Sequence, residues 1–574
     1  MPCTLSPIHE IQGAGHTSPL EGREVVVEGV VTAVGSKDED QGLFLQSRTP
    51  DDDPATSEGV YVASSESVSD WSVGMVARAR GQVEEWKRSG READLTTTRI
   101  LAEDLQRLDE VADLPKPQIL GGGGSKIPEA VDDDELSKFQ PEADAIDFLE
   151  SLEGMWVEVR EAEVVGPTTR FGEIVVVSGP SPSTRSPRGG LVLGSSGTLT
   201  ERLMIGPRVR SDRMPPVAVG DRFTDPVVGV MDYAYGHFKI QAPELPTVSP
   251  ASPRDETTPL RRDDRHLTVA SFNVLNLSAQ NSQEKFDRIA TAIQKSLASP
   301  DIIALQEIQD DSGPEDDGVV TAEATLERLI QTIESLGGPR YAHRQIDPED
   351  GADGGQPGGN IRVAFLFDPA RVLFVDRGQG GPTDGLAVEE AGGVPSLSLS
   401  PGRIAPDHGS FTNSRKPLAG EFRFLGQSLF LVNLHLRSKG GDDPVYGLHQ
   451  PPKLGSEDHR NRQAEQVHDF VDRLLDVDPR ARLIVLGDTN DHEFRRPLHT
   501  LAGDHLINLV NQIPEPERYT YVYQGRSQVL DNLLVSRELA ENANPEIDIV
   551  HIAADFPAGR RASDHDPLVV KLRF

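Results

Sequence analysis

The segment His266-Leu-Thr-Val-Ala-Ser-Phe-Asn273 decides the fold of the C-terminal half of this chain. It is an apolar strand that ends on a polar residue, and Ile302-Ile-Ala-Leu305 repeats this arrangement before Gln306 and Glu307. A helix is expected between the two strands, because apolar residues recur there at helical spacing: Phe286, Ile289, Ala290, Ile293 and Leu297. Strands that alternate with helices are typical of an α/β fold.

The same pattern continues to the end of the chain. Further strands are predicted over residues 362–367, 429–436, 483–486, 529–535 and 568–572. A second helix, ended by Gly337, is predicted from the spacing of Leu326, Leu329, Ile330, Ile333 and Leu336. Hairpin-like spacing around Gly426 favours mixed rather than purely parallel sheets. We therefore predict that residues 265–574 form one α/β (α+β) domain built on mixed β-sheets.

The N-terminal half has the pattern of short strands joined by polar loops. Residues 24–34, 42–46, 59–63 and 74–81 have strand character, which predicts a small Greek-key barrel of the oligonucleotide-binding (OB) type over residues 5–110. A run of four glycines at 121–124 and an acidic run at 132–135 predict a linker over residues 111–140. A weaker copy of the strand pattern predicts a second OB-like, β-rich domain over residues 141–242. A Pro-rich linker over residues 243–264 follows it.

The composition limits how the chain can recognise its partners. The net charge is −35, with 24 basic and 44 acidic residues up to residue 260 (−20), and 33 basic and 48 acidic residues after it (−15). Neither half can bind phosphates by bulk positive charge, so any nucleic-acid binding must use a few local cations. The single cysteine, Cys3, excludes an internal disulfide. No run approaches the ~18 apolar residues of a membrane-spanning helix, and no signal peptide follows Met1.

Polar and ionisable residues stand at or just past the ends of the predicted C-terminal strands. A single residue of this kind is usually a turn, a helix cap or a satisfied core group. The joint pattern favours an active site, because strand ends on one edge of a sheet converge on one cleft. The residues that take part are Asn273, Gln306, Glu307, His435, Asp488, Asn490, Asp531, Asp564 and His565.

These residues lie in motifs whose order resembles that of the endonuclease/exonuclease/phosphatase superfamily, which includes pancreatic deoxyribonuclease and the apurinic-site endonucleases. The motifs are Phe272-Asn-Val-Leu-Asn276, Leu305-Gln-Glu307, Asn433-Leu-His435, Gly487-Asp-Thr-Asn490, Leu530-Asp531 and Ser563-Asp-His-Asp-Pro567. The resemblance implies that residues 265–574 form a four-layer sandwich of two mixed β-sheets flanked by helices. The opening segment from Ile8 to Leu20, followed by a strand-rich barrel, is similar to the leader domain of bacterial extracellular nucleases.

The resemblance and the chemistry of phosphodiester hydrolysis together suggest a role for each residue. The reaction needs a cation on the phosphate, a base for the water and an acid for the leaving oxygen. Asn273, Glu307 and Asp564 offer hard oxygen ligands that suit Mg²⁺ or Mn²⁺. His565 would be the base, oriented by Asp531.

The remaining candidates would surround the reacting phosphate. His435 would donate a proton to the leaving oxygen or hold the phosphate. Asp488 and Asn490 would position water or a second cation. Three basic residues would contact the substrate, and for each the alternative is a solvated loop charge: Arg415, Arg362 and Lys439.

The predicted function is that of a Mg²⁺-dependent nuclease, acting on DNA more readily than on RNA. Two alternatives stay open: an enzyme acting on inositol phosphates or sphingolipids, and an inactive surface protein that retains the sandwich. The resemblance of the leader predicts an extracellular or periplasmic protein, whose signal would lie upstream of Met1. The missing signal leaves a cytoplasmic location open. Nothing in the sequence predicts the oligomeric state.

Overall fold

The computed structural model describes residues 5–35, 41–195, 198–378 and 380–574, so Cys3 lies outside the described residues. The chain divides into two compact units. Unit 1 comprises Met1–Pro253, Asp442–Lys453 and Gln524–Arg526, and unit 2 comprises Arg254–Gly441, Leu454–Tyr523 and Ser527–Phe574. Two short segments within the C-terminal half, Asp442–Lys453 and Gln524–Arg526, thus belong to unit 1. Every helix of the described residues is too short or too polar to span a lipid bilayer.

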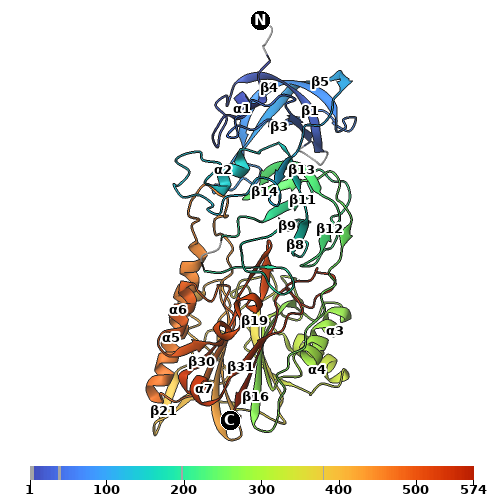
Figure 1. Ribbon diagram of the computed structural model, residues 1–574. Coiled ribbons are helices and arrows are strands. Elements are labelled where there is room, and N and C mark those ends of the chain that lie inside the picture. Colours follow the sequence, from blue (N-terminus) through green and yellow to red (C-terminus); the bar gives the residue numbers. More distant parts are fainter. Residues whose placement is uncertain (1–4, 36–40, 196–197, 379) are drawn as a thin grey trace. The chain divides into compact units, whose positions relative to one another are not determined.

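Unit 1 begins with a short helix and a closed five-stranded barrel (Figure 1). The strand order around the barrel is β1-β2-β3-β5-β4. Alternate side chains of the strands fill the interior together with Ile8 and Ile11 of the helix, all of them buried. The elements are α1 (Ile8–Gln12), β1 (Glu24–Gly35), β2 (Gly42–Gln46), β3 (Gly59–Ser64), β4 (Met75–Trp86) and β5 (Thr97–Val111).

The rest of unit 1 is built on a nine-stranded mixed sheet in the order β15-β12-β8-β9-β11-β14-β13-β7-β6. The region expected to be a second barrel-like domain thus contributes to a sheet that is not closed, and β6 joins it from the expected linker. The strands of this sheet are β6 (Gln118–Leu120), β7 (Trp156–Val159), β8 (Ala162–Gly166), β9 (Ile174–Ser178), β11 (Leu203–Gly206), β12 (Arg222–Phe223), β13 (Val227–Ala234), β14 (His237–Gln241) and β15 (Val248–Ser249). Helix α2 (Ala145–Glu150) precedes β7, and β10 (Leu191–Val192) lies outside the sheet.

The segment Asp442–Lys453 packs into the core of unit 1. Tyr446 is only 5% exposed, and its carbonyl oxygen accepts a hydrogen bond of 2.6 Å from the hydroxyl of Tyr233. The rings of Phe238 and Tyr446 meet edge to face at 5.7 Å. A loop that lies far downstream in the sequence is therefore part of the hydrophobic core built by residues 95–248.

Unit 2 contains the two predicted mixed sheets. The first has six strands in the order β18-β19-β17-β16-β32-β31. In it β16 runs parallel to β17 and antiparallel to β32. Its elements are β16 (His266–Leu277), α3 (Gln283–Thr291), a π-helical turn (Ala292–Ser296), β17 (Ile302–Ile308), α4 (Glu323–Ser335), β18 (Ala342–Arg344), β19 (Arg362–Phe367), β31 (Glu546–Ile549) and β32 (Leu568–Arg573).

The second sheet of unit 2 has the order β20-β24-β25-β26-β30-β27, with β23 paired to β24. Its strands are β20 (Leu373–Phe374), β23 (Gly402–Arg403), β24 (Leu418–Phe424), β25 (Gln427–His435), β26 (Leu483–Asp488), β27 (Leu506–Asn508) and β30 (Asp531–Ser536). The helices of this half are α5 (Gly455–Val477), α6 (Arg496–Ala502) and α7 (Arg537–Asn542). Four strands lie outside this sheet: the hairpin β21 (Val388–Ala391) and β22 (Val394–Leu397), β28 (Tyr521–Tyr523) and β29 (Arg526–Gln528). Short 3₁₀ turns occupy Gly409–Phe411, Leu509–Gln512 and Glu515–Glu517.

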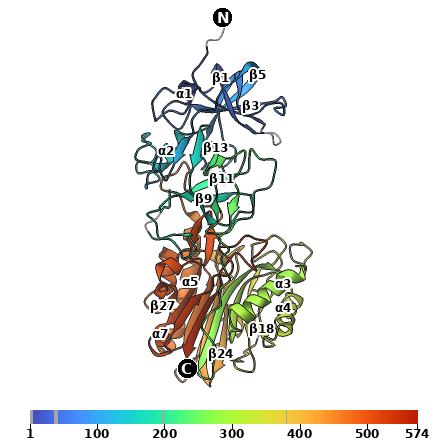
Figure 2. The same ribbon diagram turned by 45° about the vertical axis from the view of Figure 1, so that its right-hand side comes forward.

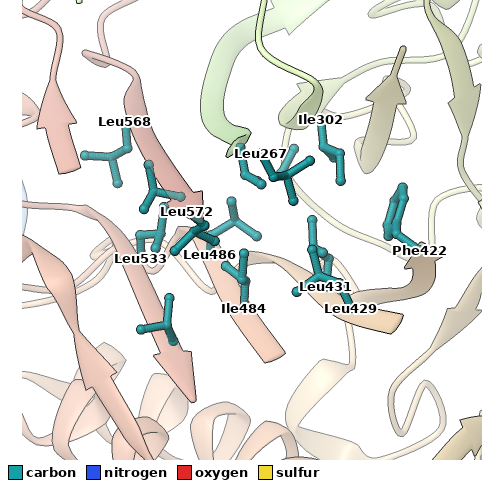
Figure 3. Packing of buried hydrophobic residues seen from close by; sticks show 14 of the residues in the cluster. Leu267, Ile302, Phe422, Leu429, Leu431, Ile484, Leu486, Leu533, Leu568 and Leu572 are labelled. Carbon is teal, nitrogen blue, oxygen red and sulfur yellow. The ribbon is translucent and has the colours of Figure 1, made fainter. Parts of the chain in front are cut away.

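Alternation along the strands produces the layers. Leu267 of β16 packs in the core between the sheets with Ile484 and Leu572 (Figure 3). Val269 belongs to the same core, while Ala270 and Phe272 pack on the side of the helices. Each buried leucine of this core contributes about 1.5–3 kcal/mol relative to an exposed one. Helices α3 and α4 cover one outer face, and α5 covers the other (Figure 2). The predicted four-layer sandwich is thereby confirmed.

One detail of the predicted helices is wrong. Helix α4 ends at Ser335, so Leu336 is its C-cap residue and is 39% exposed instead of lining the apolar face. Gly337, at φ +88°, turns the chain away directly after it.

Candidate active site

Six predicted residues from both sheets of unit 2 meet at one end of the sandwich. They are Asn273, Glu307, His435, Asp488, Asp531 and His565. The pairing of the strands brings them together, because His435 lies opposite Asp488 and Asp488 lies opposite Asp531 in adjacent strands of one sheet. Asn273 and Glu307 come from β16 and β17 of the other sheet.

Asp488 lies at the centre of the cluster. Its Oδ2 is 3.1 Å from Nδ2 of Asn273, 3.4 Å from Nε2 of His435 and 3.9 Å from Nε2 of His565. The residue is 1% exposed, and burial raises the pKa of its carboxyl group. Its Oδ1 accepts a hydrogen bond of 2.8 Å from the backbone amide of Asn490, whose φ of +51° closes the turn.

Glu307 is presented by a bulge at the end of β17. Its φ is +61°, and the register of β17 shifts beside it on both neighbouring strands. The carboxylate accepts hydrogen bonds from the amide nitrogen of Asn276 at 3.0 Å and from Nδ2 of Asn273 at 3.1 Å. Its side chain is 17% exposed, so this carboxylate is reached by solvent while Asp488 is not.

The chemistry of this cluster suits a divalent cation. Glu307, His435 and Asp488 each offer a ligand atom, and these atoms lie within 4.8 Å of one another. Two carboxylates and an imidazole match the oxygen and nitrogen ligands of Mg²⁺, Mn²⁺ and related ions. Nδ2 of Asn273 donates to both carboxylates, while its Oδ1 accepts from the amide nitrogen of Leu275. Oδ1 of Asp564 is buried and accepts no hydrogen bond from any residue that the structure describes.

His565 and Asp531 form a buried dyad. Nδ1 of His565 lies 2.8 Å from Oδ2 of Asp531, and the residues are 6% and 2% exposed. Burial lowers the pKa of His565, but the nearby carboxylates of Asp531 and Asp488 outweigh it, so the pKa is raised well above its ordinary value. Thr520 holds the strand in place, since its hydroxyl oxygen accepts from the amide nitrogen of Asp531 at 3.1 Å.

His435 differs from His565 in its electrostatic surroundings. Burial, the guanidinium of Arg415 and the imidazole of His565 lower the pKa of His435 well below its ordinary value. Its imidazole is therefore neutral. A neutral imidazole can bind a cation or contact a phosphate, but it is not a general acid. Its Nδ1 is buried and has no hydrogen-bond partner among the described residues.

The three predicted substrate-binding cations occupy different environments. Arg415 is 6% exposed, donates to the carbonyl oxygen of Leu436 at 2.6 Å and is attracted by Asp488 and Glu307, so it is not a solvated loop charge. Arg362, 2% exposed, donates instead to Asp347 and to the backbone. Lys439 contacts Oδ1 of Asp491 at 2.8 Å.

Two residues near the site were not predicted from the sequence. Lys285 donates from Nζ to the carbonyl oxygens of Leu275 and Asn276, which both have positive φ. Burial lowers the pKa of Lys285 to about 8, against the attraction of Glu307 and Asp564. The ring of Tyr521 lies 4.7 Å from that of His565. Neither belongs to a motif that carries chemistry by itself.

A buried amide pair links the two sheets behind the site. Nε2 of Gln306 donates to Oδ1 of Asn433 at 2.8 Å, and Asn433 donates to the carbonyl oxygens of Leu305 and Ala364 at 3.1 and 3.0 Å. Both residues are fully buried. The pair fixes β17 of one sheet against β25 of the other, one residue before Glu307 and two before His435.

Comparison with known proteins is consistent with this geometry. Residues 270–565 match the model of the Endonuclease/Exonuclease/phosphatase family, and residues 112–250 match a Domain of unknown function (DUF8508). No curated protein matches the chain.

Similar solved structures each cover about half of this chain. TDP2 of D. rerio, complexed with single strand DNA product, is 18% identical and has a TM-score of 0.34, covering 54% of this chain and 99% of its own. The human Nocturnin catalytic domain with bound sulfate anion is 17% identical, with a TM-score of 0.33 and coverages of 54% and 94%. A mannosyl-6-phosphatase of Bacteroides thetaiotaomicron is 15% identical, with a TM-score of 0.32 and coverages of 54% and 100%.

Enzymes of the matched family are hydrolases of phosphate esters and generally use divalent metal ions. The family model spans more than half of the chain, from β16 to His565. The protein therefore belongs to the endonuclease/exonuclease/phosphatase family.

Proposed function

We propose that this protein is a nuclease that hydrolyses phosphodiester bonds with the help of Mg²⁺ or Mn²⁺, and that DNA is its preferred substrate. The observation that carries the proposal is the position of the His565–Asp531 dyad. Nε2 of His565 lies near the carboxylate of Asp488, which also accepts a hydrogen bond from Asn273. Asp488 belongs, with Glu307 and His435, to the candidate cation site. A base and a cation site thus lie within a few ångströms of each other.

In the proposed reaction His565 takes a proton from the attacking water at Nε2. Asp531 holds the ring through Nδ1 and stabilises the imidazolium as it forms. His435, which is neutral, and Arg415 contact the phosphate oxygens. A cation held by Glu307 and Asp488, with Asn273 and Asp564 as further ligands, would neutralise charge on the phosphate. The leaving 3′-oxygen would take its proton from solvent water. By resemblance, the products would carry a 5′-phosphate and a 3′-hydroxyl.

The role that we propose for His435 is narrower than the sequence suggested. Its lowered pKa favours phosphate or cation binding over proton donation. Asn490 would keep the Asp488 turn in place through its backbone amide. We assign no role in the proposed reaction to Arg362 and Lys439, whose nitrogen atoms contact Asp347 and Asp491.

The preference for DNA rests on the similarity of the leader segment to that of bacterial extracellular nucleases. The test incubates the full-length protein and Mg²⁺ with circular duplex DNA, linear DNA, RNA, an inositol phosphate and sphingomyelin in parallel. We expect cleaved circles with the wild type and with His343→Gln, a control at a histidine on β18 outside the site, and none with His565→Gln. Hydrolysis of the inositol phosphate or sphingomyelin without cleavage of any nucleic acid would overturn the proposal.

We also propose that the protein works outside the cytoplasm, again from the similarity of the leader segment. The test is fractionation of the native cells with antibodies against the protein. Recovery from the medium or the periplasm is the expected result, and recovery from the cytosol alone would contradict it.

A further inference from the structure

A second cluster of possible metal ligands lies in unit 1, within the leader segment and the barrel. His9 is on α1, and Asp51 and Glu58 lie in the loop between β2 and β3. Nδ1 of His9 lies 3.4 Å from Oε1 of Glu58 and 3.8 Å from Oδ2 of Asp51. One ligand atom from each of the three residues lies within 4.8 Å of the other two.

The loop itself holds the two carboxylates in this position. The amide nitrogen of Asp51 donates to Oε1 of Glu58 at 2.7 Å, which holds the two residues together within the loop. Asp51 in turn accepts from the amide of Asp53 at 2.8 Å and from the hydroxyl of Thr56 at 2.9 Å. These bonds orient both acidic side chains before any ligand binds, which reduces the entropy lost on binding.

Two buried polar atoms at the cluster have no hydrogen-bond partner among the described residues. Glu58 is 5% exposed, and its Oε2 accepts no hydrogen bond. Nδ1 of His9 is also buried and makes none, although it faces both carboxylates. Buried polar atoms without partners are rare in native proteins, and a bound ion can satisfy such atoms.

We propose that His9, Asp51 and Glu58 bind a divalent transition-metal ion, Zn²⁺ or Mn²⁺. One imidazole nitrogen and two carboxylates form a ligand set that such ions accept, with positions left for water. The ion would take the unpartnered lone pairs of Nδ1 and Oε2 and would offset the charge of two neighbouring carboxylates. It would fasten α1 to the loop before β3. The site is structural and separate from the residues of the proposed reaction.

The test measures metal binding to the full-length protein after removal of metals with EDTA. The protein is dialysed against micromolar Zn²⁺, or against Mn²⁺ in a parallel arm, and the metal bound per chain is determined by elemental analysis. The Zn²⁺ arm is repeated in millimolar Mg²⁺, which competes for the active site. The variants are His9→Gln and Glu58→Gln, and the matched control is His343→Gln, which removes a histidine 3.3 Å from a single carboxylate, that of Glu323.

We expect the wild type and His343→Gln to bind one ion more per chain than His9→Gln and Glu58→Gln, whose affinity for that ion should fall by about tenfold or more. In millimolar Mg²⁺, Zn²⁺ should raise the midpoint of thermal unfolding of the wild type more than that of His9→Gln. His9 is partly exposed, so its variant should fold even if Glu58→Gln does not. Equal binding by the wild type and folded His9→Gln would overturn the proposal.

Discussion

Replacement of Asp531 by Asn separates the two roles that we assign to its carboxylate. The change removes a charge 2.8 Å from Nδ1 of His565 in a place where both residues are less than 10% exposed. Loss of one partner of a buried charge pair costs about 3–5 kcal/mol. The imidazolium forms in the transition state, so the same loss should raise the activation free energy. The value of kcat/KM should then fall by about 10²- to 10⁴-fold.

The pH profile supplies a second and independent readout. Burial lowers the pKa of His565, and Asp531 contributes strongly to the net increase. His565 must be neutral to act as a base, so wild-type activity should rise with pH through a pKa above the ordinary ~6.5 of histidine. In Asp531→Asn burial remains while the attraction is lost, so the acid limb should move to lower pH. The deficit of the variant should therefore be smaller at acidic pH than at neutral pH.

The assay is kcat/KM for cleavage of a short DNA duplex in saturating Mg²⁺ over a range of pH, with folding checked by circular dichroism. Asp263→Asn is the control, because Oδ1 of Asp263 lies 2.7 Å from Nδ1 of His266 in a solvent-exposed pair of the same unit. It should change neither activity nor the profile. A folded Asp531→Asn enzyme with an unmoved acid limb and less than about tenfold loss would refute the role of the dyad.

Four further predictions concern the metal, a positioning residue, the amide pair and the two units. Activity should vanish in EDTA and return with Mg²⁺ or Mn²⁺, and Glu307→Gln should lower kcat by several powers of ten in a folded protein; full activity in EDTA would contradict this. Lys285→Met should lower kcat/KM, measured by steady-state kinetics, by about ten- to a hundredfold. The carbonyl oxygens of Leu275 and Asn276 lose their donor in this variant, so the amide of Asn276 holds Glu307 less firmly. Asn433→Leu should lower the free energy of unfolding by about 2–4 kcal/mol, measured in urea, because Gln306 and two carbonyl oxygens lose their partners. A chain starting at Arg254 should still cleave short oligonucleotides. Its free energy of unfolding, measured by denaturation, should be about 2–3 kcal/mol lower, because Tyr446 loses its buried partners.

The sequence predicts the sandwich and the convergence of strand ends well, for a simple physical reason. Alternation and helical spacing are local signals, and the ends of paired strands such as those of His435 and Asp488 must meet. Closure of a sheet is not a local property, because a strand of a barrel and a strand of an open sheet can have the same pattern. The second predicted barrel, over residues 141–242, was therefore indistinguishable from part of the nine-stranded sheet.

Other features of the site depend on conformation that no pattern encodes. Lys285 resembles any solvated lysine in the first turn of a helix, and it is buried only because Leu275 and Asn276 turn their carbonyls toward it. Arg415 and Arg362 both appear in loops or at strand ends as ordinary charges. Their different surroundings, one near the carboxylates of the site and one engaged by Asp347, follow from the packing of distant loops.

The two excursions of the chain, Asp442–Lys453 and Gln524–Arg526, affect how such a protein can be exchanged by recombination. A single crossover near residue 253 would combine the N-terminal half of one relative with the segments 442–453 and 524–526 of another. Three separate stretches would then have to be transplanted together for the core around Tyr233 and Tyr446 to stay matched. The two halves therefore cannot be exchanged independently. Substitutions at Tyr446, in the loop before α5, should be coupled in evolution to substitutions at Tyr233, which lies 213 residues earlier in the sequence.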